Sequence, residues 1–333
     1  MPIRTSHAMR ILVVTAVLVA ALAAIWAMQK APKPHRVGLL SPAPASAQSP
    51  NIGAFYDGLR ERGHVEGRNL ILEWRYGDAR EDRLASAARE LVDLKVDVIV
   101  AFGPSATRAA MRATSTIPIV MSTFDAVEQG LVKSLSHPGG NVTGWSVESR
   151  QSGARQLALL KEALPGVSRV GAIHNPAMPG QAGLMQSLKD DASRLGLDLY
   201  PVPVSGPDQL TAAFMSMREQ GLQAFFVIAE PAIIDQLRTR IVALAAEHRI
   251  PAMYPFSMYV DAGGLMSYGP SLRELVGRSA HFVDRILDGA KPADIPVETP
   301  DKYGLDLNLK TAEALGITFP MALRAYAQPR PVK

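Results

Sequence analysis

The chain contains an internal repeat: three short apolar segments of its first half return, in the same order, in its second half. Each segment is followed by turn residues, which is typical of buried strands, and helical patterns lie between the segments. A repeat of this size predicts two similar α/β lobes with a ligand cleft between them. The matched pairs are residues 36–42 with 169–176, 96–102 with 224–229, and 117–120 with 250–253.

The later part of the chain predicts how the lobes are joined. The glycine-rich residues 263–269 are predicted to cross back between the lobes, and the extended residues 291–299 to cross a third time. Residues 271–288 have an apolar stripe at helical spacing, and residues 127–136 are also predicted to be helical. The predicted fold is therefore α/β, with two similar doubly wound parallel-sheet lobes and a hinge of three crossovers.

The sequence divides into an N-terminal targeting segment and the two lobes. Arg4 and Arg10 lie in a short basic region, and residues 11–28 are apolar without a charge, which is the layout of a secretory signal peptide. The apolar stretch also reaches the length that spans a bilayer, so an uncleaved membrane tether is the alternative. Both interpretations place the globular part in the periplasm. The predicted parts are residues 1–30 as signal peptide or membrane anchor, residues 36–143 with 268–298 as lobe 1, and residues 144–267 with 299–325 as lobe 2.

Composition excludes several classes of protein. The formal net charge is +4, but Arg4, Arg10 and Lys30 lie in the first thirty residues, which hold no acidic residue. No cluster of Lys and Arg interleaves with aromatic residues, so we expect no nucleic-acid partner. The chain has no cysteine, which excludes disulfides, zinc–thiolate sites, thiol catalysis and a lipid-anchored cysteine.

Motifs for cofactors and catalysis are missing from the sequence. No Gly-x-Gly-x-x-Gly, no Walker loop and no Gly-x-Ser-x-Gly elbow follows a predicted strand. The histidines are scattered and form no His-x-x-x-His pair for a metal ion. We therefore expect no cofactor, no metal ion and no catalytic step, and we expect a small-molecule ligand instead.

The loops after the predicted strands contain the candidate ligand-binding residues, because ligands of open parallel sheets bind beyond the carboxyl ends of the strands. Asp125 and Glu230 are the acidic residues at these loop tips, and either carboxylate suits a ligand ammonium group. Ser105 and Thr123, with nearby backbone N–H groups, suit a carboxylate or another polar end. The full predicted set is Ser41, Ser105, Ser122, Thr123, Asp125, Asn175, Glu230, Tyr254, Phe256 and Tyr268.

Each of these residues also has a purely structural interpretation. Ser105 stands where a helix N-cap is expected, and Asp125 and Glu230 stand where a helix-start carboxylate is expected. Asn175 precedes a proline and suits a turn. A single aromatic residue is more often part of a core than of a site, but the grouping of the aromatic residues on cleft loops favours stacking on a flat ligand.

Several motifs are specific enough to compare with known families. The most specific are PGGNVTG at residues 138–144 and AGGLMSYG at residues 262–269, and shorter motifs lie at residues 94–100, 116–120 and 308–312. In these motifs the chain resembles the ABC-transporter substrate-binding protein family of the tryptophan-binding type. The similarity extends from about residue 36 to residue 320.

The resemblance implies a type I periplasmic-binding-protein fold that closes over a small ligand, with tryptophan or a related compound as the best-known ligand class. It also implies that the liganded form docks on an ABC permease driven by its ATPase. The predicted function is an extracytoplasmic, monomeric solute-binding protein that takes up an amino acid or an aromatic or carboxylate compound by hinge closure. Two alternatives stay open: a ligand-sensing domain that serves a receptor, and an exported α/β enzyme.

Overall fold

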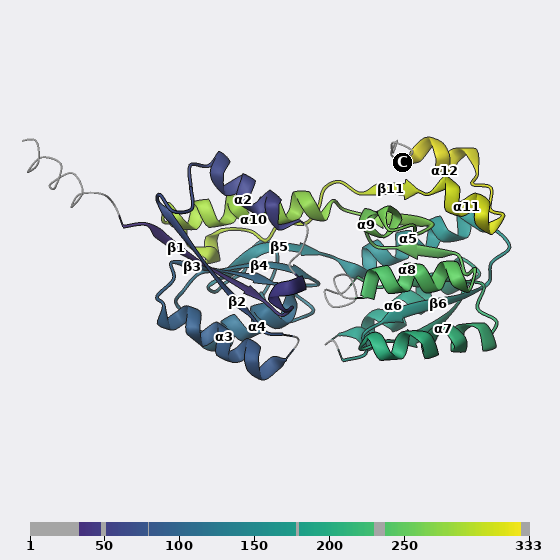
Figure 1. Cartoon of the computed structure of the whole chain (residues 1–333), viewed down its shortest axis with the longest axis horizontal. Helices are drawn as coiled ribbons and strands as arrows, with labels where there is room; N and C mark the ends of the chain where they lie inside the picture. Colours follow the sequence, from purple (N-terminus) through teal and green to yellow (C-terminus); the bar gives the residue numbers. More distant parts are fainter. Residues whose placement is uncertain (1–32, 48–50, 79, 178–179, 230–236, 328–333) are drawn as a thin grey trace, which may run out of the picture.

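The computed structural model describes residues 33–47, 51–78, 80–177, 180–229 and 237–327. These residues form two lobes that lie side by side, each built around a largely parallel sheet (Figure 1). The predicted signal peptide or anchor lies outside the described residues. Within them, no helix has both the length and the apolar content that a membrane crossing requires.

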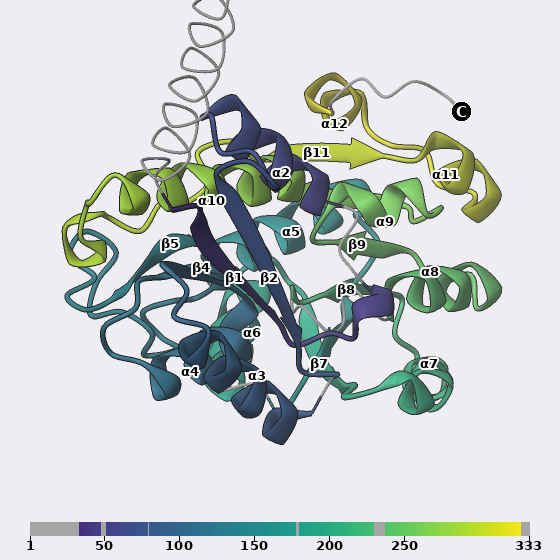
Figure 2. The ribbon, with the colours of Figure 1, turned by 60° about the vertical axis from the view of Figure 1, so that its left-hand side comes forward.

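The sheet of lobe 1 has five parallel strands in the order β2-β1-β3-β4-β5. Its central strands are continuous apolar runs, because helices cover both faces of the sheet. In Figures 1 and 2 strands β1 and β2 run from the outer end of lobe 1 toward lobe 2. The strands are β1 His35–Ser41, β2 Leu70–Tyr76, β3 Val98–Phe102, β4 Ile119–Phe124 and β5 Val142–Val147.

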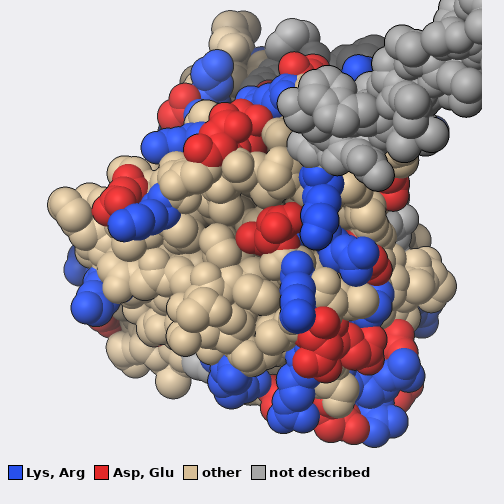
Figure 3. Space-filling model, turned by 90° about the vertical axis from the view of Figure 1, so that its left-hand side faces the viewer, with Lys and Arg blue, Asp and Glu red and all other residues tan. Residues whose placement is uncertain are grey.

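Four helices enclose this sheet. Helices α2 (Ile52–Glu61) and α10 (Leu272–Leu287) cover one face, and α3 (Glu81–Asp93) and α4 (Gly103–Ala113) cover the other (Figure 1). A short 3₁₀ turn, η1 (Ala45–Ala47), follows β1. On the outer end of the lobe, acidic and basic side chains lie interspersed, with no large area of one sign (Figure 3).

Lobe 2 repeats this arrangement. Its six strands have the order β11-β10-β9-β8-β6-β7, so that β7-β6-β8-β9-β10 repeats β2-β1-β3-β4-β5, and β11 is added antiparallel to β10. The predicted pair of similar doubly wound lobes is confirmed. The strands are β6 Arg169–His174, β7 Asp198–Pro203, β8 Ala224–Val227, β9 Ala252–Tyr254, β10 Met266–Gly269 and β11 Gly304–Leu307. The edge strand β7 contains Pro201 and Pro203.

Helices cover both faces of the second sheet as well. One face packs against α5 Ser149–Ala163, α6 Gln181–Arg194, α11 Leu309–Leu315 and α12 Met321–Tyr326. The other packs against α7 Leu210–Glu219, α8 Arg238–Glu247 and α9 Ser257–Asp261. The 3₁₀ turns η2 (Pro207–Gln209) and η4 (Pro292–Asp294) complete the described elements.

Three crossovers join the lobes: from β5 to α5, from β10 to α10, and from Glu298 to β11. The first and third crossovers lie side by side. Ser146 donates its backbone N–H to the carbonyl of Glu298 at 2.9 Å, and Glu298 donates its own to the carbonyl of Gly144, also at 2.9 Å. The hinge is therefore a hydrogen-bonded pair of chain segments with a third segment beside them.

Helix α10 confirms the helix predicted at residues 271–288. Ser271 is its N-cap, and the Ser271 hydroxyl accepts the backbone N–H of Glu274 at 3.3 Å. Leu275, Phe282 and Ile286 of the predicted stripe are buried against α2 and the first sheet.

The helix predicted at residues 127–136 does not form. Turns replace it, and they begin at Asp125, whose φ is 49°, and continue through Gly130, whose φ is 67°. Both values lie in the left-handed region, which interrupts a right-handed helix. The apolar spacing is explained instead by Leu131 and Val132, which are buried in the core of lobe 1.

Gly144 lies on β5 directly beside the backbone of β4. Its φ is 135°, and a Cβ there would lie 2.1 Å from the carbonyl oxygen of Met121. Substitution Gly144→Ala is expected to lower the free energy of unfolding by about 3 kcal/mol, because it combines a steric clash with backbone strain. Urea unfolding measures the loss. Gly140→Ala, where a Cβ meets nothing within 4 Å, is the matched control, and equal losses in both variants would contradict the argument.

Candidate functional site

The lobes touch where strands of both sheets end. Phe124 ends β4 of lobe 1, and Phe256 follows β9 of lobe 2. Their ring centroids are 6.3 Å apart, with the ring planes tilted by 48°. The loops predicted to line a cleft are thus brought together at the junction of the lobes.

A small cavity lies at this junction. Its free space is about that of one water molecule, so a ligand of amino-acid size enters only when the lobes or the lining side chains move. The lining is mostly apolar, with a few polar groups, as is typical of small-molecule sites. It consists of Val147, Ser149, Ser152, Gly153, Gln156, Leu188, Phe226, Ile228, Ala229, Pro255, Phe256 and Pro270.

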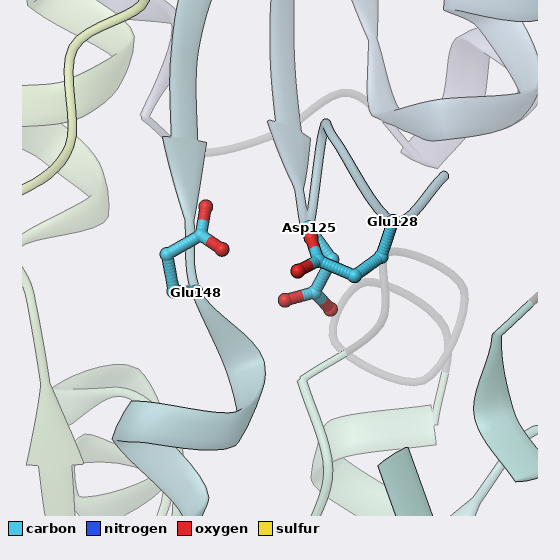
Figure 4. Close-up of side chains that lie close together, drawn as sticks. All are labelled: Asp125, Glu128 and Glu148. Atoms are coloured by element: carbon cyan, nitrogen blue, oxygen red, sulfur yellow. The ribbon is translucent and has the colours of Figure 1, made fainter. Parts of the chain in front are cut away.

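Three carboxylates gather beside the first crossover. Asp125 and Glu128 come from the turn after β4, and Glu148 comes from the end of β5, directly before α5 (Figure 4). One oxygen of each lies within 4.8 Å of the others. Ser149, which follows Glu148, also lines the cavity, so the carboxylates lie next to it.

Hydrogen bonds fix two of the carboxylates. Ser149 donates its backbone N–H to Oδ1 of Asp125 at 2.7 Å. The Ser146 hydroxyl donates to Oε1 of Glu148 at 3.0 Å and accepts the N–H of Ala126 at 3.1 Å. Among the described residues, no Lys or Arg forms an ion pair with any of the three carboxylates.

This environment makes the carboxyl groups harder to ionise. Burial raises the pKa of Asp125, with a smaller contribution from the charge of Glu128, while the hydrogen bonds from Ser149 oppose the rise. Burial likewise raises the pKa of Glu148, helped by the charges of Asp125 and Glu128 and opposed by the Ser146 hydroxyl. Such a group of carboxylates attracts a cation, either an ammonium group or a hard metal ion that prefers oxygen ligands.

The predicted hydroxyl residues of lobe 1 lie close to this region but are already engaged. Ser105 lies inside the first turn of α4, whose N-cap is Phe102, so the expected N-cap role of Ser105 is wrong. The Ser122 hydroxyl lies 3.2 Å from that of Ser279 on α10. Thr123 is fully buried, and its hydroxyl donates to the carbonyl of Phe124 at 3.4 Å. Contacts of these residues with a ligand stay a prediction.

The predicted residues at the first strand of each lobe stabilise their own turns. The Ser41 hydroxyl accepts the N–H of Ala43 at 3.2 Å. The side-chain oxygen of Asn175 accepts the N–H of Ala177 at 3.1 Å, which is an Asx turn. Glu230 lies outside the described residues.

The three predicted aromatic residues differ in position. Phe256 lines the cavity. Tyr254 is fully buried and stacks on Tyr259 with centroids 4.8 Å apart. Its hydroxyl has no hydrogen-bond partner among the described residues, and burial raises its pKa. Tyr268 stacks on Tyr303 of the third crossover at 5.6 Å. These contacts show Tyr254 in the core of lobe 2 and Tyr268 at the hinge.

An aromatic stack at the ends of β2 and β3 was not predicted from the sequence. The ring of Trp74 lies 5.3 Å from that of Tyr76 and 5.8 Å from that of Phe102, with nearly parallel planes, and the Trp74 indole donates to the Tyr56 hydroxyl at 3.0 Å. All four residues are partly exposed. The alternation in β2 was the available signal, because Trp74 and Tyr76 are two residues apart and share a face. Glu148, Ser149, Ser152 and Gln156 were missed as well.

The fold, with two similar lobes that meet where strands of both sheets end, is that of a two-lobed binding protein. The chain belongs to the family described as ABC transporter substrate binding protein, whose model matches residues 38–330. The resemblance seen in the sequence motifs is therefore confirmed.

Individual relatives agree with this assignment. The Tyrosine-binding protein of Clostridioides difficile (strain R20291) is 28% identical over 262 residues, which cover 78% of this chain and 75% of that protein. A conserved domain protein from Vibrio cholerae is 28% identical with a TM-score of 0.82, and the ABC domain from Streptococcus pneumonia, in complex with L-Trp, is 25% identical with a TM-score of 0.80. Both structural matches cover 89% of this chain and 99% of the other.

Replacement of Glu148 by Gln is expected to change how stability depends on pH. The folded-state pKa of Glu148 is raised, so its contribution to stability is complete below the unfolded-state pKa and is lost as the pH rises through the folded-state value. A glutamine side chain does not ionise and therefore loses no stability as the pH rises. Glu148→Gln should gain stability relative to wild type as the pH rises from about 4 to about 8.

Urea unfolding at both pH values measures this difference. Glu313→Gln on α11, where the side chain is exposed, is the matched control. A similar pH-dependent gain in the control would show that the buried position of Glu148 is not its cause.

Proposed function

We propose that this protein is the extracytoplasmic solute-binding component of an ABC importer. It binds a small molecule between its lobes and delivers it to a membrane permease that works with an ATPase. Its family membership supports this role. In this proposal the protein acts as a monomer in the periplasm, either free after cleavage of its signal peptide or tethered by residues 11–28.

The ligand class is best supported by one observation: three carboxylates lie beside an apolar cavity. Asp125 and Glu148 have no basic partner among the described residues, so a cation from outside the chain would neutralise them. The cavity beside them offers the ring of Phe256 and other apolar walls. A ligand with an ammonium group and an apolar body matches both, which favours an amino acid.

An aromatic side chain is the most suitable apolar body. Phe124 and Phe256 provide aromatic surface between the lobes, and the partly exposed stack of Trp74 and Phe102 adds more in lobe 1. The names of two relatives refer to tyrosine and L-Trp. We infer that this chain binds an aromatic amino acid; the alternative ligand is an aromatic carboxylate.

The remaining predicted residues complete the proposed site. Ser105, in the first turn of α4, and Thr123 are proposed to receive the ligand carboxylate, aided by free N–H groups of the helix. Glu230 is proposed as a second acidic contact from lobe 2. Ser41, Ser122, Asn175, Tyr254 and Tyr268 are proposed to shape the site, directly or through the loops that they fix.

Hinge closure would link binding to delivery. A ligand that contacts both lobes favours the closed arrangement by as much as its affinity differs between the open and closed states. The small free volume at the junction supports this mechanism, because the lobes have to part before a ligand of amino-acid size enters. The permease would then distinguish the closed form from the open form.

A thermal-shift screen tests the proposed ligand. L-Trp and L-Tyr are compared with tryptamine and tyramine, which lack the carboxylate, and with the deaminated propionate analogues, which lack the amine. A true ligand at about a hundred times its Kd should add about 2.7 kcal/mol to the free energy of unfolding. A response to the deaminated analogues but not to the amino acids would refute the ammonium role of the carboxylates.

Asp125→Asn is expected to weaken binding of the amino acid about tenfold to a hundredfold, because a charge-assisted hydrogen bond is lost. Isothermal titration calorimetry measures the change. Asp78→Asn is the matched control: Asp78 has the same φ of 49°, and its carboxylate pairs with Arg83 at 2.8 Å. Unchanged affinity in Asp125→Asn would remove Asp125 from the site.

A further inference from the structure

Asp125 belongs to lobe 1 but caps the first helix of lobe 2. Its Oδ1 accepts the backbone N–H of Ser149, the first residue of α5, at 2.7 Å. Its own N–H donates to the carbonyl of Val147, the last residue of β5, at 3.1 Å. The carboxylate is therefore fixed at the point where the chain first passes from one lobe to the other.

Helix α5 receives no cap from its own N-cap residue. Glu148 holds that position, and its side chain makes no capping hydrogen bond. The N-terminus of a helix has unpaired N–H groups and a partial positive charge, which an ionised carboxylate stabilises. Asp125 supplies this carboxylate from lobe 1. A neutral carboxyl group in its place is a weaker acceptor.

The turn that contains Asp125 is also tied to the third crossover. Ala126 donates its N–H to the hydroxyl of Ser146, which is fully buried, at 3.1 Å. Ser146 in turn donates its backbone N–H to the carbonyl of Glu298 at 2.9 Å. A change in the bonding of Asp125 thus affects two of the three connections between the lobes.

We propose that Asp125 is a positioning residue that couples the charge of the ligand site to the hinge. When ionised, it caps α5 and holds the first crossover in the arrangement seen here. When protonated, it releases the cap, and the lobes part. This coupling rests on the proposed function, in which the ammonium group of the ligand keeps Asp125 ionised. Ligand binding and lobe closure then both depend on whether the Asp125 carboxyl group carries a proton.

The groups around Asp125 set the balance between the two forms. Glu128 in its own turn and Glu148 at the junction of β5 and α5 disfavour its ionisation, and Tyr303 of the third crossover interacts with Glu148. The N-terminus of α5 favours ionisation. Burial is the largest cause and raises the pKa of Asp125, so proton uptake occurs at higher pH than for an exposed aspartate.

The distance between the lobes tests the proposal directly. The chain has no cysteine, so the exposed positions Arg89→Cys on α3 and Met215→Cys on α7 accept one spin label each. Helices α3 and α7 lie on the same side of the two lobes (Figure 1). Electron–electron double resonance is recorded on the full chain without ligand. The wild-type distribution should shift to longer distances as the pH falls from about 8 to about 4.

Asp125→Asn should abolish this shift. Asn suits the left-handed φ of Asp125 and cannot ionise, and it offers the Ser149 N–H only a neutral oxygen, so the distances should stay long at every pH. Asp78→Asn, the matched control, should shift as wild type does. The proposal is overturned if the wild-type distances do not respond to pH, or if Asp125→Asn responds as wild type does.

A second pair of variants tests the hydrogen bond from the Ser149 N–H without changing Asp125: one variant removes the donor, and the other keeps it. Ser149→Pro suits the first position of a helix and lacks the N–H donor, whereas Ser149→Ala keeps it. Ser149→Pro should show longer distances at every pH, whereas Ser149→Ala, which loses only the hydroxyl contact with Asp125, should keep the pH-dependent shift. Identical distributions in the two variants would overturn the proposal. Because no ligand is present, these results are independent of the ligand screen, and either can fail without the other.

Discussion

The burial of α10 against α2 and the first sheet is the interaction on which the architecture depends. This helix follows lobe 2 in the chain, yet its apolar side, with Leu275 and Phe282, is buried in lobe 1. The close approach of the helices requires Gly58, where a Cβ would lie 2.9 Å from the Cβ of Ala280. Because the chain returns to lobe 1 to bury α10, it crosses between the lobes three times, which keeps the strand ends of the two sheets together.

The chemistry at the junction follows from this arrangement. Parallel strands end at one edge of each sheet, so polar and aromatic residues from distant parts of the chain meet there. The apolar part comes from lobe 2 and includes Phe256, whereas the acidic part comes from Asp125, Glu128 and Glu148 beside the first crossover. The carboxylates that suit a ligand cation therefore belong to the same segments as the hinge.

The sequence predicted the fold better than the site. Repeated apolar segments and turn residues sufficed to predict two similar parallel-sheet lobes, because local pattern and burial agree in both lobes. The helix predicted at residues 127–136 is wrong, because the left-handed backbone of Asp125 begins a turn there. No residue type in the sequence indicated that turn. Turn residues showed where strands end but not which side chain faces the junction. Tyr254 lies in the core, whereas Phe256 lines the cavity. Glu148 was not predicted as a site residue because its position depends on the hydrogen bonds that join the first and third crossovers.

The prolines of β7 have a consequence for the protein at high concentration. Pro201 and Pro203 lie in the outermost strand of the second sheet, opposite Ala172 and His174 of β6. A proline has no amide hydrogen, so this margin offers fewer donors to an incoming chain. Edge-to-edge growth of the sheet from one molecule to the next is thereby discouraged, and crowded copies are protected from fibrous aggregation on this side.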